Sequence, residues 1–305
     1  RNFDLDIVAV PVDGTQPRPY LSTSKYEYSP SWSGSGDRMA YITDRSGTCE
    51  IWIRSAKGDW EIPVVTQSDF PDDENLRFIS AVISPDGEKL AYVKGIGPSG
   101  GRLWVSSSSG GKPVSAIPPH PGIGYFENGL SWSPDSKSLA CNIFVEGISE
   151  LAIIGVGGGK PPEFIPVPAP LSTAPAWSPD GRWIAFGNDK ERCVFLVSPD
   201  GKKTLKWPSP VAPWGQGYVL AWANDGATLY IASSRGEGRL DALEIKTGES
   251  RTIARFERDI AFYGWNNMCL FGSMAADGRS FLTATYTNAS DLWILDGVPL
   301  PGRRK

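Results

Sequence analysis

Short apolar runs alternate with polar turns along the whole chain, and one turn phrase recurs between them. The phrase has the form Ser-Pro-Asp-Gly and returns at intervals of 45 to 52 residues. Its six copies, some of them degenerate, begin at Ser33, Ser84, Ser133, Ser178, Ala223 and Ala275. Proline presets φ, aspartate bonds the backbone two residues on, and glycine supplies the positive φ of a tight turn. The phrase therefore predicts one hairpin turn, repeated six times.

Large apolar residues flank every copy of the turn phrase at fixed distances. The residues directly before it are Trp32, Ile83, Trp132, Trp177, Trp222 and Met274. The residues six positions after its start are Met39, Leu90, Leu139, Ile184, Leu229 and Phe281. This constant offset predicts that each turn joins two buried strands.

Each repeat continues with two further strand patterns after a polar loop. The third is apolar, as at residues 51–53, 103–105 and 292–295, and the fourth is more polar, as at residues 60–65 and 251–254. Proline in the fourth pattern is typical of an edge strand. Four short strands per repeat, without an amphipathic helix, predict an all-β fold: a β-propeller of four-stranded antiparallel blades.

We predict one propeller domain that spans residues 1–305. The blade cores are expected at residues 28–65, 79–116, 129–165, 174–206, 219–254 and 269–296. Residues 7–10 and 18–21 have the pattern of third and fourth strands, although residues 292–295 already supply a third strand to the last repeat. One strand is thus surplus. Either residues 7–10 form an extra edge or connecting strand, or a seventh blade is split, truncated or upstream of Arg1. We favour six blades with the ring closed through residues 1–21.

Composition excludes several classes of function. A net charge of −4 argues against nucleic acid as a partner, and the basic residues 303–305 are expected to be a solvated terminus. No apolar run is long enough to span a membrane. The chain begins at Arg1, so we expect that a preceding segment has been removed or left out. We expect no metal or cofactor, because there is one histidine, His120, and the four cysteines lack paired spacing.

Apparent catalytic motifs also have a simpler interpretation. Residues 97–101 match G-x-S-x-G, but the nucleophile elbow needs a following helix and a histidine partner. We interpret this stretch as a glycine-rich hairpin loop. The acidic run at residues 69–74 lacks the spacing of a calcium loop and is expected to be solvated. No catalytic residue is assigned.

The stretch 176–186, Ala-Trp-Ser-Pro-Asp-Gly-Arg-Trp-Ile-Ala-Phe, resembles the WD-like β-propeller repeat of the bacterial TolB-type family. The resemblance covers essentially the whole chain, with departures at Gly34, Asn224 and Ala276 in place of proline. It implies a bacterial propeller, periplasmic or otherwise extracytoplasmic, with a cytoplasmic location as the alternative. Propellers of this type act as binding platforms, as sensor domains and as accessory domains of peptidases.

The long loops opposite the turn phrases are the predicted binding surface, which we call the loop face. Aromatic and arginine side chains anchor interfaces, and loops on a rigid scaffold commonly carry function. The candidate residues on these loops are Phe70, His120, Tyr125, Phe126, Trp207, Trp214, Tyr218, Arg255, Arg258, Tyr263 and Trp265. The alternative for any one ring is that it fills a gap between blades or caps the channel.

These observations favour a monomeric, non-catalytic propeller that binds a protein or small-molecule ligand, as a sensor or binding domain of a larger bacterial protein. The alternative is an enzyme: a propeller hydrolase or lyase, or the accessory propeller of a prolyl-oligopeptidase-like peptidase. The peptidase also needs a hydrolase domain with Ser, Asp and His, and the 305 residues contain none.

Overall fold

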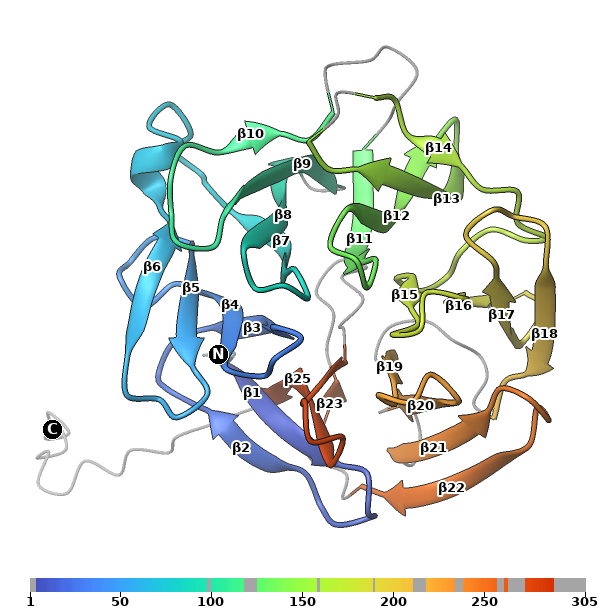
Figure 1. The fold of residues 1–305 in the computed structure, drawn as a ribbon. Coiled ribbons are helices and arrows are strands. Elements are labelled where there is room, and N and C mark those ends of the chain that lie inside the picture. The colour runs from blue at the N-terminus through green and yellow to red at the C-terminus, as the bar shows by residue number, and fades with distance from the viewer. Residues whose placement is uncertain are drawn as a thin grey trace, which may run out of the picture.

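The chain folds as a ring of blades around a central axis (Figure 1). The computed structural model describes residues 4–97, 100–117, 125–157, 160–188, 190–210, 218–233, 238–256, 261–262 and 272–287. Within these residues there are six four-stranded antiparallel blades. The predicted β-propeller, with six blades rather than seven, is therefore confirmed.

Five blades follow one another along the chain, each with its first strand innermost (Figure 1). The first blade comprises β3 (Glu27–Trp32), β4 (Arg38–Thr43), β5 (Glu50–Ser55) and β6 (Glu61–Val65), followed by the short 3-10 helix η1 (Gln67–Asp69). The second comprises β7 (Phe78–Ile83), β8 (Lys89–Gly97), β9 (Gly100–Ser107) and β10 (Val114–Ser115). The third comprises β11 (Tyr125–Trp132), β12 (Ser138–Val145), β13 (Ile148–Gly155) and β14 (Glu163–Phe164). The fourth comprises β15 (Ala176–Trp177), β16 (Ile184–Asn188), β17 (Cys193–Val197) and β18 (Thr204–Pro208). The fifth comprises β19 (Tyr218–Trp222), β20 (Thr228–Ser233), β21 (Arg239–Glu244) and β22 (Ser250–Arg255).

The sixth blade joins the two ends of the described chain. Its inner strands are β23 (Ala261–Phe262) and β24 (Ser273–Met274), which pair with one edge of β25 (Ser280–Thr287). The other edge of β25 pairs with β1 (Asp4–Pro11), and β2 (Arg18–Leu21) is outermost. Closure of the ring through the N-terminal segment is confirmed.

One expectation about this blade is wrong. The third-strand place, assigned to residues 292–295 from the sequence, is taken by β1, whose eight residues pair in register with β25. Ile7 and Val10 of β1 are fully buried, so the N-terminal strand has the apolar contacts that this place requires. Residues 292–295 lie outside the described residues.

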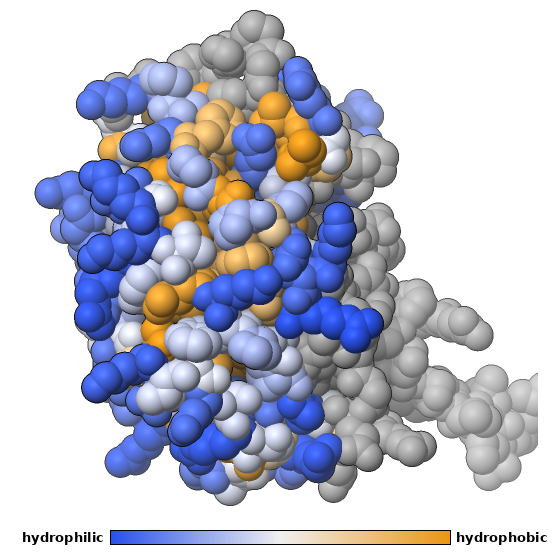
Figure 2. Space-filling model, turned by 90° about the vertical axis from the view of Figure 1, so that its right-hand side faces the viewer, coloured by the Kyte–Doolittle hydropathy of each residue, from blue (hydrophilic) through white to orange (hydrophobic). Residues whose placement is uncertain are grey.

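Apolar side chains fill the contacts between neighbouring blades, which we call seams. Val82, Leu130 and Trp132 belong to a cluster in the seam between the second and third blades. Strands buried on both faces have near-continuous apolar sequences, as in β16 and β17. The outer rim is mixed, with hydrophobic patches among hydrophilic side chains (Figure 2). No helix within the described residues has the length and apolar character needed to cross a membrane.

The six turn phrases share one backbone geometry. The fourth residue of each has a positive φ and donates its N–H to the carbonyl oxygen of the first, at N···O distances of 2.8 to 3.0 Å. These fourth residues are Gly36, Gly87, Ser136, Gly181, Gly226 and Gly278. The predicted hairpin turn is confirmed in every copy.

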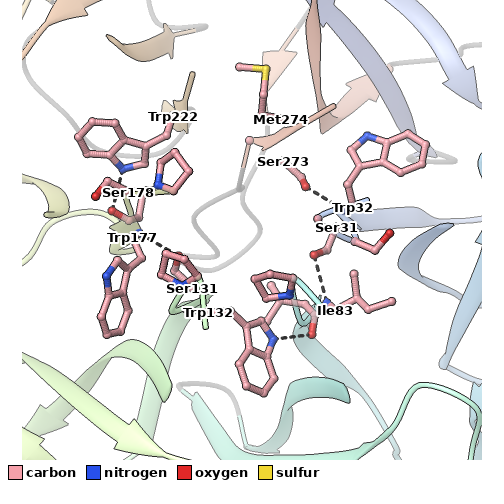
Figure 3. Close-up of a pocket in the computed structure, with 18 of the residues that line it drawn as sticks. Ser31, Trp32, Ile83, Ser131, Trp132, Trp177, Ser178, Trp222, Ser273 and Met274 are labelled. Carbon is pink, nitrogen blue, oxygen red and sulfur yellow. Dashed lines mark hydrogen bonds between the residues drawn. The ribbon is translucent and has the colours of Figure 1, made fainter. Parts of the chain in front are cut away.

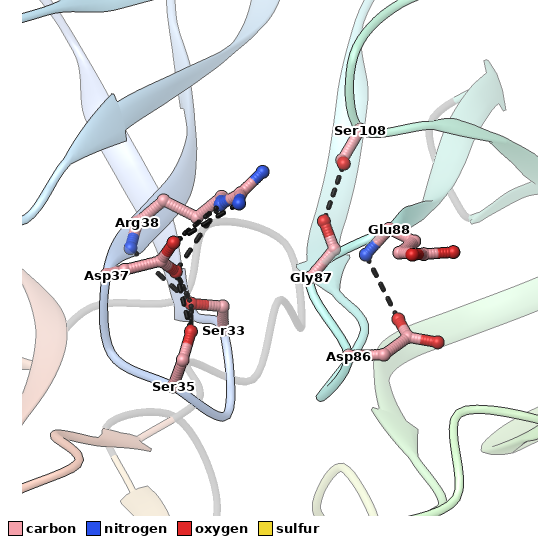
Figure 4. Close-up of polar contacts among 8 residues, drawn as sticks. All are labelled: Ser33, Ser35, Asp37, Arg38, Asp86, Gly87, Glu88 and Ser108. Carbon is pink, nitrogen blue, oxygen red and sulfur yellow. Dashed lines mark hydrogen bonds and ion pairs between the residues drawn. The ribbon is translucent and has the colours of Figure 1, made fainter.

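Aspartate closes the turn from within. The Ser133 hydroxyl donates to Oδ1 of Asp135 at 2.6 Å, and the same oxygen accepts the backbone N–H of Lys137 at 3.2 Å. In the first copy the acid stands two places later, and Asp37 accepts from the hydroxyls of Ser33 and Ser35 (Figure 4). The aspartates thus belong to the turns themselves.

A seventh copy of the phrase, at residues 198–201, joins β17 to β18. It has the same internal bonds: the Ser198 hydroxyl donates to Asp200 at 2.6 Å, and Asp200 accepts from the backbone of Lys202 at 3.1 Å. The count of six from the sequence missed it, because it lies off the repeat period. The phrase therefore specifies a type of hairpin rather than one position in the blade.

Candidate functional site

A cavity of about 530 Å³ lies at the centre of the ring, among the first strands and the turn phrases (Figure 3). Its rim is formed by the second residue of each phrase: Gly34, Pro85, Pro134, Pro179, Asn224 and Ala276. All six blades therefore contribute to it. The sequence assigned these turns only a structural role, whereas the structure places them at the mouth of a cavity.

Below the rim, the residue before each phrase forms the next ring of the lining. Trp132 and Trp222 are only 7% and 6% exposed. The four labelled indoles point away from the centre, into the seams (Figure 3). Serine and proline side chains also line the cavity, among them Ser31, Ser131 and Ser273. The indoles therefore act as wedges between the blades rather than as a binding surface.

Three of the seams are bridged by a serine of a first strand. The Ser31 hydroxyl accepts the backbone N–H of Ile83 at 3.1 Å, from the first blade to the second. In the same way Ser131 accepts from Trp177, and Ser273 accepts from Trp32, both at 2.8 Å. Each serine satisfies a backbone donor that would otherwise be unpaired at the inner edge of a blade.

Two seams are bridged by an indole instead. In these seams an apolar residue stands at the first-strand position that carries the bridging serine in other blades. Trp132 Nε1 donates to the carbonyl oxygen of Val82 at 3.1 Å, and Trp222 Nε1 donates to that of Ala176 at 2.9 Å. At the seam between the fifth and sixth blades, Asn224 Nδ2 donates to the carbonyl oxygens of Ala275 and Ala276 at 3.1 and 2.9 Å. Hydrogen bonds between described residues thus cross all six seams around the cavity, which fixes the shape of its wall.

The departures from proline in the turn phrase have a structural reason at two positions. The Gly34 N–H donates to the carbonyl oxygen of Pro85 at 2.9 Å, and a Cβ on Gly34 would lie 2.6 Å from that oxygen. Proline, which has no N–H and carries a Cβ, is excluded there. Asn224 provides the one side-chain amide among the described lining residues, and it bridges a seam.

These departures fall on three adjacent blades, the fifth, sixth and first. The rim consequently has two unlike halves. One half carries three prolines, Pro85, Pro134 and Pro179, and the other carries Asn224, Ala276 and Gly34. A ligand at the rim would contact proline side chains on one side, and the small residues and the asparagine amide on the other.

Among the described residues that line this cavity there is no acid, base, histidine or cysteine. The described lining therefore has no side chain that would transfer a proton at neutral pH or act as a strong metal ligand. Elsewhere in the described residues, no group of three or more His, Cys, Asp and Glu side chains is placed to hold a metal ion. The described lining offers van der Waals contact and hydrogen bonding.

Carboxylates stand around the mouth, on the outer side of the turns. The Ser35 and Ser33 hydroxyls hold the pKa of Asp37 well below its usual range. The Ser133 hydroxyl likewise lowers the pKa of Asp135. The hydrogen bonds within the turns therefore keep these acids ionised to a lower pH than an ordinary aspartate.

The predicted loop-face residues do not all lie on loops. Phe126 is in β11, only 4% exposed, and packs in the core between the second and third blades. Trp207 is in β18, half-buried, and its ring lies so close to Gly248 that a Cβ there would be 2.2 Å from a ring carbon. Both positions are corrections to the expected loop placement. A large ring is well suited to fill the wedge between two twisted blades.

Phe70 is half-buried near η1 and packs edge-on against Trp104, with ring centroids 5.0 Å apart. The Lys94 ammonium lies 5.2 Å from the centre of the same ring. Phe70 therefore covers the seam between the first and second blades. Arg255, at the end of β22, is exposed, and its carbonyl oxygen accepts from Gln16 at 3.0 Å.

The remaining candidates on the loop face are not described as side chains. Tyr125 and Tyr218 begin β11 and β19, and only their backbones are described. The others lie outside the described residues: His120, Trp214, Arg258, Tyr263 and Trp265. Whether the predicted set forms one site therefore stays a prediction. The sequence contains one feature that could have pointed to the central cavity. The three turn phrases without proline at the second position belong to neighbouring blades.

Sequence comparisons link the chain to two kinds of protein, and no family model matches it. Dipeptidyl-peptidase 5 of Porphyromonas gingivalis is 23% identical over 86% of this chain and 45% of its own length. The Tol-Pal system protein TolB of Bordetella pertussis is 29% identical over 52% of this chain and 34% of its own length. The chain thus spans less than half the length of these relatives.

Solved structures share the fold at low sequence identity. A putative TolB from Agrobacterium tumefaciens has a TM-score of 0.69 and 18% identity, covering 94% of this chain and 99% of that one. TolB from Acinetobacter baumannii has a TM-score of 0.58 and 14% identity, over 93% and 63% of the two chains. An oligogalacturonate lyase in complex with manganese has a TM-score of 0.55 and 12% identity, over 94% and 91%. At these identities the likeness establishes the architecture, not the activity.

Proposed function

We propose that this chain, a propeller of the TolB type in its repeat and fold, is a non-catalytic module that binds an uncharged segment of a partner protein at the mouth of its central cavity. The observation that carries the proposal is the lining of the cavity, to which all six blades contribute and in which none of the described residues has an ionisable side chain. Such a wall is suited to hold a ligand and has no group for acid–base chemistry.

The volume and rigidity of the cavity support binding. About 530 Å³ falls within the range of small-molecule and peptide side-chain pockets. The hydrogen bonds across the seams hold the wall in place before a ligand arrives, so that little conformational entropy is lost on binding.

The chemistry of the wall favours an uncharged segment. A charged side chain would lose its hydration in the cavity without gaining a partner, which costs several kcal/mol in typical buried sites. Apolar side chains and main-chain amides would instead find proline rings, serine hydroxyls and the Asn224 amide. A protein partner is consistent with the relatives named for the Tol-Pal system.

The loop face is our second candidate surface, for a protein or small-molecule ligand. Trp214, Tyr263 and Trp265 stand on its loops in the sequence, and rings of this kind anchor many interfaces. We further propose an extracytoplasmic location, on the resemblance to TolB-type proteins, and a monomeric state.

A second candidate function is that of an accessory propeller in a peptidase. The observation that favours it is the match to dipeptidyl-peptidase 5 along 86% of this chain. Sequencing the gene on both sides of the region that encodes residues 1–305 tests it. A hydrolase domain with Ser, Asp and His in the same reading frame would support the peptidase. If the frame encodes no such domain, the peptidase function is rejected and the binding module remains as the proposal.

Selection of peptides from a displayed random library on the immobilised chain tests the proposed function. Selected peptides should share a core of at least four uncharged residues and should compete with one another for a single site. A selection dominated by charged cores would overturn the proposed mode of binding. Turnover of peptide or oligosaccharide substrates by the purified chain would overturn the non-catalytic assignment.

A further inference from the structure

The three serines that bridge seams keep a hydrogen-bond donor for the cavity. Ser31, Ser131 and Ser273 line the cavity, and each hydroxyl oxygen accepts a backbone N–H of the next blade at 2.8 to 3.1 Å (Figure 3). A hydroxyl has one O–H donor besides its acceptor lone pairs. No described residue accepts the hydrogen of any of these three hydroxyls. Three O–H groups are therefore available to a ligand in the cavity.

Two other serines of the lining show the opposite arrangement. Ser33 donates its hydroxyl hydrogen to Asp37, and Ser178 donates to Asp180, both at 2.7 Å. Each of these two hydroxyls also accepts the backbone N–H of the residue five places on. Both functions of the hydroxyl are thus used inside the turn. The hydroxyl donors that remain in the described lining belong to the first strands, two positions before the turn phrase.

Several acceptors of the lining are already used by the seams. The carbonyl oxygens of Val82 and Ala176 accept indole N–H groups at 3.1 and 2.9 Å. Those of Pro85 and Ala276 each accept an N–H from the neighbouring rim residue at 2.9 Å. These four oxygens are committed to contacts between blades, whereas the three serine hydrogens are not. A ligand that brings acceptors into the cavity therefore finds donors waiting for them.

The type of acceptor follows from the charge of the wall. A carboxylate could accept bonds from hydroxyl groups, but no described residue of the lining carries a positive charge to offset the loss of its hydration. An uncharged carbonyl oxygen has a smaller cost of desolvation. Main-chain carbonyl oxygens need a partner whenever they leave water, and every residue of a peptide carries one. The main chain of a bound segment is therefore the acceptor that the wall suits best.

The position of the three donors gives the segment an orientation. Ser31 and Ser273 belong to the first and sixth blades, whose rim residues are Gly34 and Ala276. Glycine and alanine carry no ring, so the main chain of a ligand can approach these two hydroxyls closely. Ser131 belongs to the third blade, in the half of the rim with the three prolines. That half offers apolar contact to the side chains of the segment.

We propose that Ser31, Ser131 and Ser273 donate hydrogen bonds to main-chain carbonyl oxygens of the segment that the cavity binds. This inference rests on the proposed function and names the groups of the segment that are recognised. The main chain of the segment faces the half of the rim with Gly34 and Ala276, and its apolar side chains face the prolines. The three donors thus select an extended main chain more than one particular sequence.

Calorimetric titration of one library-selected peptide into serine variants of the full chain tests the proposal. Ser31→Ala, Ser131→Ala and Ser273→Ala should each weaken binding about threefold or more, as the loss of one uncharged hydrogen bond does. Ser198→Ala is the matched control and should bind as the parent does. The Ser198 hydroxyl also accepts a backbone N–H, at 2.9 Å, but it donates to Asp200 and is not part of the described lining.

Substitutions in the peptide show whether the serines act on carbonyl groups. One main-chain amide at a time is replaced by a thioamide, whose sulfur is a weaker acceptor than oxygen. At one position or more the thioamide should weaken binding to the parent about threefold or more, but weaken binding to one of the serine variants by less than about twofold. The reason is that the hydroxyl partner is already missing in that variant. A serine that only holds the wall in place would show no such coupling.

The outcomes separate this inference from the proposed function. Unchanged affinity in all three serine variants, or thioamide effects that are the same in parent and variants, would overturn the inference. If Pro134→Arg/Pro179→Arg still weakens binding in that case, the proposed function stands without it. A library that yields no peptides competing for a single site would reject both. If an alanine variant does not fold, the cysteine variant takes its place, because a thiol is only a weak donor.

Discussion

Trp132 Nε1 donates a hydrogen bond to the carbonyl oxygen of Val82 at 3.1 Å, across the seam between the third and second blades. The pair illustrates a rule that holds at five of the six seams, the exception being the Asn224 amide between the fifth and sixth blades. Where a serine precedes the last residue of a first strand, its hydroxyl takes the N–H of the next blade, as Ser131 does for Trp177. Where that position is apolar, as at Val82 and Ala176, the indole of the next blade makes the bond instead.

The indole bond at this seam should contribute measurable stability. Trp132→Phe keeps an aromatic ring but leaves the buried Val82 carbonyl oxygen without its donor, which typically costs about 1–3 kcal/mol. Trp32→Phe is the matched control, because Trp32 Nε1 is buried and has no partner among the described residues. Urea unfolding should show a larger loss for Trp132→Phe than for Trp32→Phe. Equal losses would mean that ring volume, not the hydrogen bond, accounts for the effect.

Restoring proline to the first turn phrase should destabilise the protein. Gly34→Pro removes the N–H that bonds the Pro85 carbonyl oxygen and adds a Cβ that would lie 2.6 Å from it. We expect a loss of about 2 kcal/mol or more in the free energy of unfolding. Gly34→Ala keeps the N–H and should lose less than Gly34→Pro. Proline is the commonest residue at this position of the phrase, and substitution by the commonest residue often stabilises a protein. A Gly34→Pro protein more stable than the parent would contradict the contact with Pro85.

Ser136 holds a backbone conformation that favours glycine and makes a bond that glycine cannot make. Its φ is +58°, and its hydroxyl accepts the backbone N–H of Asp86 from the neighbouring blade at 3.0 Å. Ser136→Ala loses the bond and keeps the strain, whereas Ser136→Gly loses the bond and relieves the strain. Thermal unfolding should place the glycine variant above the alanine variant by about 1 kcal/mol. The reverse order would show that the positive φ is not strained.

Acid should weaken the turns. The hydroxyl of Ser133 lowers the folded-state pKa of Asp135 below its unfolded value near 4. Its contribution is therefore present above about pH 4 and is lost as the pH falls through the folded-state pKa. Because the turn is exposed to solvent, each such acid contributes little by itself. Urea midpoints measured from pH 7 to pH 3 should fall less in the Asp37→Asn/Asp135→Asn protein than in the parent, and an identical slope would contradict this origin.

The turns were predictable because their sequence requirement is local. Gly87 needs a positive φ and Asp86 bonds within its own turn, so four residues specify the hairpin wherever they occur. The third strand of the sixth blade was not predictable in this way. Residues 7–10 and 292–295 both have the residue pattern of a strand. A local pattern does not decide which of two such segments pairs with a strand that is distant in the sequence.

The loop placement of two candidate residues was wrong for a related reason. From the sequence alone, an aromatic side chain on a loop can either be exposed for binding or be packed between two blades. Phe126 and Trp207 are packed between blades. The turn phrases have two roles at once, since Pro134 and Pro179 both shape a hairpin and form the rim of the cavity. Because the hairpin alone explains why the phrase recurs, there was no reason in the sequence to expect that the same residues also line a cavity.

The rim offers a variant set for the central claim, binding at the mouth of the cavity. Pro134 and Pro179 are exposed on the rim, and their turns tolerate other residues at this position. Pro199→Arg is the matched control, because it changes the same position of the phrase at residues 198–201, which does not line the cavity. Trp214→Ala/Tyr263→Ala/Trp265→Ala reports on the loop face.

Calorimetric titration of one library-selected peptide into these folded proteins is the most direct test. Binding at the mouth of the cavity predicts that Pro134→Arg/Pro179→Arg weakens binding at least tenfold, a loss of about 1.4 kcal/mol or more, while Pro199→Arg and the loop-face variant bind as the parent does. Unchanged affinity in the rim variant together with lost affinity in the loop-face variant would contradict it, and would place the binding site on the opposite face of the ring.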